Sequence, residues 1–131
     1  MLVITGGAGF IGSNLVNFLN NNQDEEILIV EEMDTYLKKF KNLDDLKYID
    51  CIDKNTFIND INNDSSKYKG KISNIFHLGA CSKTTEPDRD YIMSTNLKYS
   101  KDILKYSANN KISLIYASSA SVYGETKLFI E

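Results

Sequence analysis

The sequence has 131 residues, of which 42% are hydrophobic and 25% are charged, and its formal net charge is −3. This composition is typical of one ordinary globular domain and excludes a disordered or fibrous chain. The acidic balance excludes the basic surface that nucleic-acid partners require and argues against an anionic membrane as a partner. One histidine and two distant cysteines argue against a disulfide framework or a metal site. The short apolar N-terminal run suits neither a signal peptide nor a membrane span, so we expect a cytoplasmic location.

Short apolar runs alternate with helical patterns in the first part of the chain. Leu2–Thr5 is an apolar run that stops at glycines, as a buried parallel strand does. Phe10–Asn22 carries apolar residues at helical spacing, and Ile27–Val30 is a second apolar run. These three segments predict a strand–helix–strand unit of about 30 residues.

The middle of the chain is more polar, and its pattern is weaker. Met33–Asp45 predicts a loop with some helix, and Tyr48–Ile52 fits a third strand. Asp53 can cap a helix over Asn55–Asn62, after which Asn62–Gly70 reads as a surface loop.

Three further elements follow: a strand at Ile75–Leu78, a long helix over Asp88–Asn109 and a strand at Ile112–Ala117. Strands that alternate with helices predict an α/β fold, here a Rossmann-type doubly wound parallel sheet. Right-handed crossovers give the strand order 3-2-1-4-5. Ligands of such sheets bind at the carboxyl ends of the strands. The segments Leu78–Ser82 and Ser118–Ser121 lie at such ends.

The run from Thr5 to Gly12 carries the clearest functional motif, with glycines at positions 6, 9 and 12. Gly6 permits a tight turn, Gly9 lets a pyrophosphate approach the backbone, and Gly12 lets the helix pack close to the sheet. The helix N-terminus then offers free N–H groups to the anion. Because the motif lies between a strand and an amphipathic helix, it predicts a dinucleotide site rather than an unliganded loop.

Two acidic residues, Glu31 and Glu32, end the second strand about 20 residues after Gly12, where an acid is expected to bond the adenosine ribose. An acid at this position favours NAD because it repels a 2′-phosphate. Lys38 and Lys39 could offset that charge, so the residues alone leave NAD and NADP open. The alternative interpretation is that Glu31 and Glu32 are only the polar end of a strand and contact no ligand.

Three segments resemble the extended short-chain dehydrogenases/reductases: the glycine turn, Gly79-Ala80, and Ser118–Gly124. Within that superfamily, Phe76–Glu86 and Tyr116–Ala120 resemble the ADP-L-glycero-D-manno-heptose 6-epimerases of lipopolysaccharide core synthesis. The glycine turn is generic to the superfamily, whereas the Gly-Ala-Cys-Ser-x-Thr-Thr-Glu run is the specific part. The resemblance covers the whole chain and is weak between positions 33 and 71.

The resemblance implies cofactor contacts at several strand ends and a catalytic serine after the fifth strand. The implied cofactor contacts are Gly6, Gly9, Phe10, Ile11 and Gly12 in the turn, Glu31 and Glu32 as the ribose-binding pair, Lys38 or Lys39 and Lys54 as basic contacts, Leu78, Gly79, Ala80, Cys81 and Ser82 in the loop over the cofactor, and Asn96 as a supporting side chain. Ser119 matches the serine that hydrogen-bonds the reacting hydroxyl. The family usually has Asp-Asn where this sequence has Glu31-Glu32.

The activity implied by the resemblance is NADP-dependent epimerisation of ADP-D-glycero-D-manno-heptose at C6″, with transient oxidation, by a homo-oligomer when the chain is full length. Other sugar-nucleotide epimerases or dehydratases, and a non-catalytic nucleotide-binding fragment, remain alternatives. The resemblance further implies a Tyr-x-x-x-Lys pair on a helix, in which the tyrosine acts as the base. Tyr123 and Lys127 have this spacing, but they follow the strand directly and enclose Gly124, so we do not expect them to be catalytic.

The chain ends at Glu131, before the position where the family's catalytic pair and substrate domain are expected. We therefore expect residues 1–131 to form an incomplete NAD(P)-binding domain, truncated after about five strands and inactive alone. Two residues with chemically reactive side chains are expected to have structural roles only. His77 is expected to be a satisfied structural histidine, and Cys81 a small buried filler. Tyr91, Tyr99 and Tyr106 are expected to pack in or beside the core.

Overall fold

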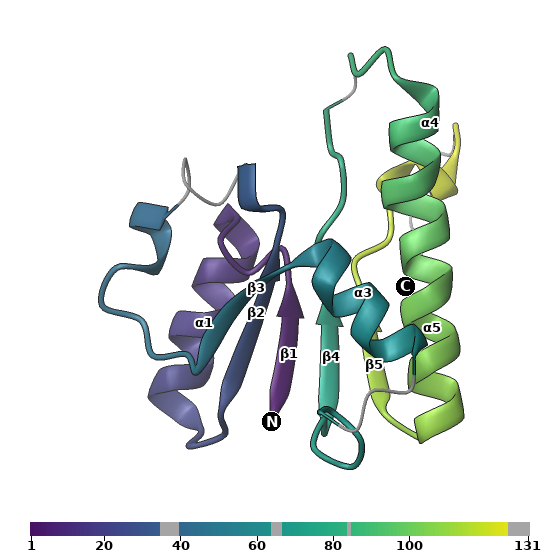
Figure 1. The fold of residues 1–131 in the computed structure, drawn as a ribbon. Helices are drawn as coiled ribbons and strands as arrows, with labels where there is room; N and C mark the ends of the chain where they lie inside the picture. The colour runs from purple at the N-terminus through teal and green to yellow at the C-terminus, as the bar shows by residue number, and fades with distance from the viewer. Residues whose placement is uncertain (35–39, 64–66, 84, 126–131) are drawn as a thin grey trace.

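The computed structural model describes residues 1–34, 40–63, 67–83 and 85–125 (Figure 1). Its centre is one five-stranded parallel sheet in the order β3-β2-β1-β4-β5, which confirms the doubly wound order predicted from the sequence. The strands are β1 (Leu2–Thr5), β2 (Ile27–Glu31), β3 (Asp50–Asp53), β4 (Asn74–His77) and β5 (Ser113–Tyr116). Thr5 pairs with Val30 on one side and with His77 on the other, so three strands end at the same edge of the sheet.

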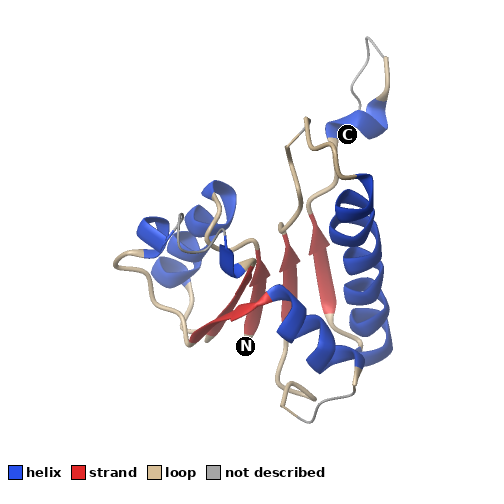
Figure 2. Ribbon diagram, turned by 45° about the horizontal axis from the view of Figure 1, so that its top comes forward, coloured by secondary structure: helices blue, strands red, loops and turns tan. Residues whose placement is uncertain are grey.

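Helices cover both faces of this sheet, as Figure 2 shows. The helix α1 (Phe10–Asn22) and the short 3-10 helix η1 (Phe40–Leu43) lie on one face, whereas α3 (Lys54–Asn62) and α5 (Tyr99–Asn110) lie on the other. The short helix α4 (Arg89–Ile92) and the π-helical segment η2 (Met93–Lys98) lead into α5, and a 3-10 turn η3 (Ala120–Tyr123) follows β5. Within the described ranges, no helix has the length and apolar character needed to cross a bilayer.

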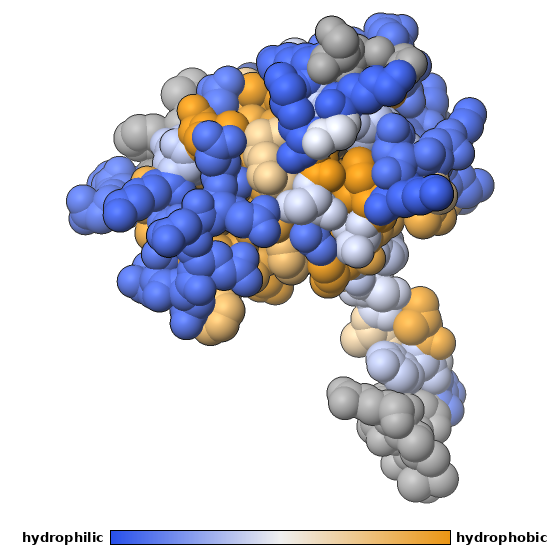
Figure 3. Space-filling model, turned by 90° about the horizontal axis from the view of Figure 1, so that it is seen from below, coloured by the Kyte–Doolittle hydropathy of each residue, from blue (hydrophilic) through white to orange (hydrophobic). Residues whose placement is uncertain are grey.

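Alternation along the central strands divides the core into two layers. Ile4 and Ile29 face α1, where Val16 is fully buried against them. Val3 and Ile75 point to the opposite face. That second layer also contains Leu28, Val30, Ile52, Phe57, Ile61, Tyr68, Ile72, Tyr99 and Ile103. Seen from the amino ends of the strands, polar side chains cover the outer surfaces and hydrophobic side chains show between them (Figure 3).

The segment predicted as one long helix is continuous, but its centre is wider than an α-helix. Residues Met93–Lys98 form a π-helix between α4 and α5. The change of pitch means that a single α-helical face does not describe the segment. Leu97 and Leu104 are exposed on this segment, although their spacing is helical.

The strand β5 is the least covered strand of the sheet. Three of its four residues are exposed, including Ile115 and Tyr116. Leu114 packs against the core from this strand, and the ring of Tyr116 stacks on His77 with 5.4 Å between centroids. The strand is therefore bonded on one side by β4 and open to solvent over much of its surface.

Candidate cofactor site

The glycine turn is built by close contact between backbones. Gly6 adopts a left-handed conformation with φ of 70°, and its N–H donates to the carbonyl oxygen of Val30 at 2.8 Å. A Cβ at Gly6 would lie 2.8 Å from the backbone of Gly79, and a Cβ at Gly12 would collide with the carbonyl oxygen of Gly6. The first and third glycines of the motif are therefore required by close backbone contacts, Gly6 with the loop after β4 and Gly12 with the turn itself.

The helix that follows the turn has no side-chain cap at its N-terminus. Its first internal hydrogen bond runs from the Ser13 N–H to the Gly9 carbonyl oxygen, so the N–H groups of Phe10, Ile11 and Gly12 precede it. Gly9 has no side chain that could cap them, and the first turn contains no acidic residue. Phe10 and Ile11 are 82% and 67% exposed. These donors, with the positive end of the helix dipole, fit a pyrophosphate group.

A buried hydrogen-bond relay ties the turn to β4 and α5. Thr5 Oγ1 accepts from the Gly79 N–H at 3.0 Å and lies 2.6 Å from His77 Nδ1. His77 Nε2 lies 2.7 Å from the hydroxyl of Ser100. Burial lowers the pKa of His77 from 6.5 to about 4, so the ring is neutral at pH 7. His77 is thus a satisfied structural histidine, as expected.

The loop after β4 is held by the side chain of Asn96. Its amide oxygen accepts from the Cys81 N–H at 2.7 Å, and its amide nitrogen donates to the Cys81 carbonyl oxygen at 2.9 Å. Asn96 lies in the π-helical segment, and its amide bonds to both backbone polar groups of Cys81. Cys81 is half-buried at the cavity rather than a buried filler. The loop residues Gly79–Ser82 are in this way fixed above the end of β1.

Glu31 ends β2 and is buried against the glycine turn. One oxygen of its carboxylate accepts from the Ala8 N–H at 3.2 Å, and the other accepts from the Glu32 N–H at 3.1 Å. The acid that is expected at the ribose is therefore held against the glycine turn by its own hydrogen bonds.

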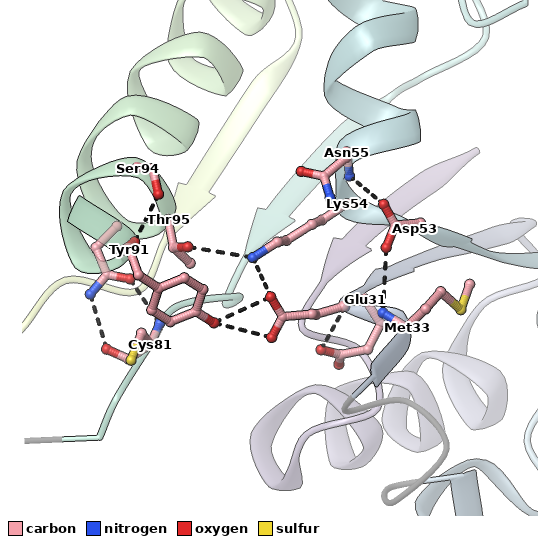
Figure 4. A network of polar contacts seen from close by, with 11 residues as sticks. Glu31, Met33, Asp53, Lys54, Asn55, Cys81, Tyr91, Ser94 and Thr95 are labelled. Carbon is pink, nitrogen blue, oxygen red and sulfur yellow. Dashed lines mark hydrogen bonds and ion pairs between the residues drawn. The ribbon is translucent and has the colours of Figure 1, made fainter. Parts of the chain in front are cut away.

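Glu32 joins β2 to the helices on the other side of the cavity. Its carboxylate accepts from Lys54 Nζ at 2.5 Å and from the Tyr91 hydroxyl at 3.1 and 3.2 Å. The side chains of Lys54 and Tyr91 point toward one another in Figure 4, with Nζ 5.1 Å from the ring centroid. Burial alone would raise the pKa of Glu32, but the bonds to Lys54 and Tyr91 outweigh it and lower that pKa below 4.5.

A cavity of about 300 Å³ lies at this edge of the sheet and brings many of the predicted residues together. The predicted residues that line it are Gly6, Glu31, Glu32, Lys54, Gly79, Ala80, Cys81 and Ser82. Seven lining residues were not predicted as site residues: Thr5, Val30, Lys83, Glu86, Tyr91, Thr95 and Tyr99. Tyr91, Thr95 and Tyr99 recur every fourth residue, and the continuous segment of α4, η2 and α5 turns all three toward the cavity.

The other predicted residues lie around the cavity or outside it. Phe10, Ile11 and Gly12 begin α1 after the N-cap Gly9, and Leu78 packs against the core layer that α1 covers. Lys38 and Lys39 lie outside the described residues. Ser119 is exposed beyond β5, where its hydroxyl accepts from the Ser121 N–H at 3.3 Å.

The segment with Tyr-x-x-x-Lys spacing does not begin as an α-helix. Tyr123 ends the 3-10 turn η3, and Gly124 follows with φ of 62°, a conformation that interrupts a right-handed helix. Thr126 and Lys127 lie outside the described residues. The geometry at positions 123 and 124 agrees with the expectation that Tyr123 is not the base of a helical pair.

Comparison with known proteins places this geometry in a family. The NAD dependent epimerase/dehydratase family model matches residues 2–130. The ADP-L-glycero-D-manno-heptose-6-epimerase of Helicobacter pylori is similar in structure, with a TM-score of 0.78 and 33% identity over 97% of this chain and 41% of that chain. The UDP-glucuronic acid 4-epimerase of Bacillus cereus, in complex with NAD, has a TM-score of 0.74 and 26% identity over 98% of this chain and 43% of that chain.

A third similar structure is the UDP-N-acetylglucosamine 4-epimerase of Methanobrevibacter ruminantium, in complex with UDP-N-acetylmuramic acid. Its TM-score is 0.75, with 27% identity over 96% of this chain and 40% of that chain. The chain thus spans about two fifths of the length of these structures. With its parallel sheet, glycine turn and strand-end cavity, it belongs to the NAD dependent epimerase/dehydratase family.

Proposed function

We propose that this chain forms the dinucleotide-binding part of a sugar-nucleotide epimerase that converts ADP-D-glycero-D-manno-heptose into ADP-L-glycero-D-manno-heptose. The observation that carries the proposal is the loop Gly79–Ser82, fixed by Asn96 directly beside the glycine turn. This loop contains the sequence run that is specific in the resemblance. The 33% identity to the Helicobacter pylori enzyme supports the same substrate.

The described residues fit a bound dinucleotide. The N–H groups at the start of α1 would hold the pyrophosphate, and Glu31 would accept a hydrogen bond from the adenosine ribose. A bound nicotinamide supplies the hydride acceptor and donor that a transient oxidation at C6″ requires. The resemblance implies NADP, with NAD as the alternative. A cytoplasmic location and a homo-oligomeric state of the full-length protein are implied in the same way.

Ser119 is the catalytic residue of this proposal within the chain. It lies just beyond β5, whose end is paired with that of β4, so it follows the same edge of the sheet as the loop. Its hydroxyl would donate a hydrogen bond to the reacting sugar hydroxyl and orient it for proton removal. Binding of the cofactor is the task of the glycine turn, Glu31 and the loop, whereas Ser119 acts on the substrate.

A second candidate is a UDP-sugar 4-epimerase, which the 26% and 27% identities to two such enzymes support. The test is to incubate the full-length product of the gene with ADP-D-glycero-D-manno-heptose and, separately, with UDP-sugars, and to follow the sugar carbons by NMR. Inversion at C6″ of the heptose supports the first candidate, and inversion at C4 of a UDP-sugar supports the second.

A Ser119→Ala variant tests the role of this serine in the same assay. We expect a lower kcat with unchanged affinity for the dinucleotide, because Ser119 lies outside the cavity lining. If the protein binds a dinucleotide but turns over neither class of sugar, the epimerase proposal fails and a nucleotide-binding role remains.

A further inference from the structure

The first residue of α5 carries a buried hydroxyl group that lacks a hydrogen-bond partner. Tyr99 is 9% exposed, and its hydroxyl oxygen bonds to no other residue that the structure describes. A buried polar group of this kind destabilises a fold, because it has lost its bonds to water and has gained none in return. Such groups are rare in native proteins, so the hydroxyl of Tyr99 calls for a specific explanation.

Tyr99 belongs both to the core and to the cavity at the strand ends. Its side chain packs in the core layer that contains Val3 and Val30, and its ring centroid lies 5.8 Å from that of His77. The same residue lines the cavity of about 300 Å³, as do Val30 and Glu31. The residue with the unsatisfied hydroxyl is therefore part of the wall of the candidate cofactor site.

Two carboxylates lie near enough to act on the phenol of Tyr99. Burial, with the carboxylates of Asp53 and Glu31 nearby, raises the pKa of Tyr99 from 10.0. The phenol is therefore protonated at neutral pH and can donate one hydrogen bond, but neither carboxylate accepts it. Glu31 and Asp53 are paired at the ends of β2 and β3, so the phenol lies toward the ends of these two strands.

A ligand group that lies between this phenol and Glu31 must both accept and donate a hydrogen bond. The phenol offers a proton, whereas a carboxylate only accepts one. A hydroxyl group meets both needs, but an ionised phosphate oxygen only accepts and is repelled by the carboxylate. In this fold the acid at the end of β2 bonds the adenosine ribose, which carries such hydroxyl groups.

We infer that the Tyr99 hydroxyl donates a hydrogen bond to a ribose hydroxyl on the adenosine side of the bound dinucleotide, which donates in turn to Glu31. The inference rests on the proposed dinucleotide function. Solvent does not reach the Tyr99 hydroxyl, so the contact requires the side chain to turn toward the cavity that it already lines. Tyr99 is thus a binding residue whose hydroxyl destabilises the ligand-free protein and stabilises the complex.

Two opposite effects of Tyr99→Phe test the inference in the full-length product of the gene. The variant removes the hydroxyl and retains the ring. Without dinucleotide, its midpoint of urea unfolding should lie above that of the wild type, because the unsatisfied group is gone. In calorimetry it should bind NAD or NADP about three- to tenfold more weakly, because one hydrogen bond is lost. A hydroxyl that serves the fold alone predicts a lower midpoint instead.

Ser107→Ala is the matched control on the same helix. Ser107 lies eight residues after Tyr99 in α5, and its hydroxyl is also buried without a partner among the described residues. It is not part of the described cavity lining. Its replacement should also raise the urea midpoint, but it should leave the affinity for the dinucleotide unchanged.

Dinucleotide analogues that lack one hydroxyl of the adenosine ribose identify the contact. The wild type should lose its advantage over Tyr99→Phe for one such analogue, because the partner of the phenol is then absent. An equal advantage for NAD or NADP and for every deoxy analogue would overturn the inference, since the phenol would then bond some other group.

Three further results would overturn the inference: a lower urea midpoint in Tyr99→Phe, an unchanged affinity in Tyr99→Phe, or an equal loss of affinity in Ser107→Ala. The proposed function is tested separately by the wild type. If circular dichroism shows a folded wild-type protein that binds neither NAD nor NADP, the proposed function itself fails. If the wild type binds and Tyr99→Phe binds equally well, only the role of Tyr99 is refuted.

Discussion

The hydroxyl of Ser100 accepts a hydrogen bond from Nε2 of His77 and thereby fixes the tautomer of the imidazole ring. Ser100 Oγ lies 2.7 Å from the Asn96 carbonyl oxygen, to which it can only donate. It must then accept from Nε2–H of His77. The Nδ1 atom of the neutral ring is left as an acceptor for the Thr5 hydroxyl. One directed chain of hydrogen bonds therefore runs from the Gly79 N–H through Thr5, His77 and Ser100 to η2.

This relay predicts a stability that falls in mild acid. His77 is 1% exposed, and its pKa drops from 6.5 to about 4 in the folded protein because of burial. Between pH 6.5 and pH 4 the unfolded chain binds a proton that the folded chain does not. The free energy of unfolding should therefore be highest above pH 6.5 and decline by about 1.4 kcal/mol per pH unit below it. Urea unfolding at pH 7.5, 6 and 5 measures this slope.

His77→Gln is the control for that slope. It removes the titrating ring and should flatten the profile between pH 7.5 and 5, while lowering stability at pH 7.5 by about 1–3 kcal/mol through lost hydrogen bonds. Glu32 does not contribute to this slope, because its pKa is lowered from 4.5. Its contribution to the free energy of unfolding is lost only in stronger acid. An unchanged slope in His77→Gln would contradict the assignment to His77.

Two glycine variants should separate binding from folding. A Cβ at Gly9 meets the Gly6 carbonyl oxygen at 3.1 Å and otherwise points into open space, so Gly9→Ala should cost about 1 kcal/mol or less. It should still weaken dinucleotide binding strongly, because the methyl group occupies the approach to the turn. Gly12→Ala should cost about 3 kcal/mol, because its Cβ collides with backbone. Urea unfolding and calorimetry with NAD measure both effects, and equal stability losses would refute this division of roles.

The amide of Asn96 should matter more to the loop than to the rest of the fold. Asn96→Ala removes both hydrogen bonds to Cys81, and Asn96→Asp retains an acceptor but loses the donor. We expect dinucleotide affinity to fall in the order wild type, Asp, Ala, with stability losses of about 1–3 kcal/mol. Hydrogen exchange at residues 79–83 should rise in the same order. Asn110→Ala is the control, because it loses an exposed bond to Tyr106 and should leave the loop unchanged.

The thiol of Cys51 should be slow to alkylate in the folded chain. Burial, with Glu31 and Asp50 nearby, raises the pKa of Cys51 from 9.0 to about 12. At pH 8 the thiolate fraction is then about a thousandfold lower than in the unfolded state. In a Cys81→Ser background, mass spectrometry after iodoacetamide treatment should show rapid labelling in urea and slow labelling in buffer. Similar rates in both conditions would show that the thiol is not shielded in this way.

The sequence predicts the strands and helices well where the signal is local. The bounds of β1 and α1 agree with the prediction, because an apolar run stops at glycines and one clear helical face follows. The third strand begins at Asp50 rather than Tyr48, because this edge strand is half exposed and lacks a continuous apolar run. The π-helical segment could not be read from periodicity, because the hydrogen bonds that accompany it join Asn96 to a distant loop.

In the candidate site, too, residues in local patterns were predicted, and residues defined by distant contacts were not. The glycine turn and the strand-end acids were found from their spacing, and Asn96 was assigned only through the family resemblance. The role of Tyr91 was missed, because its partner Glu32 lies 59 residues away and its helical spacing reads equally well as packing. The ion pair between Lys54 and Glu32 was missed for the same reason, because it joins α3 to the end of β2 across 22 residues.

The uneven cover of the sheet has a consequence for its internal motions. β1 is bonded on both sides and fully buried, whereas β5 is bonded on one side and exposes three of its four residues. Opening of β5 disrupts few apolar contacts, so its amides should exchange with deuterium through local fluctuations, and those of β1 only through global unfolding. Tyr116 stacks on His77, so each such fluctuation would also uncover the imidazole that anchors the relay to the glycine turn.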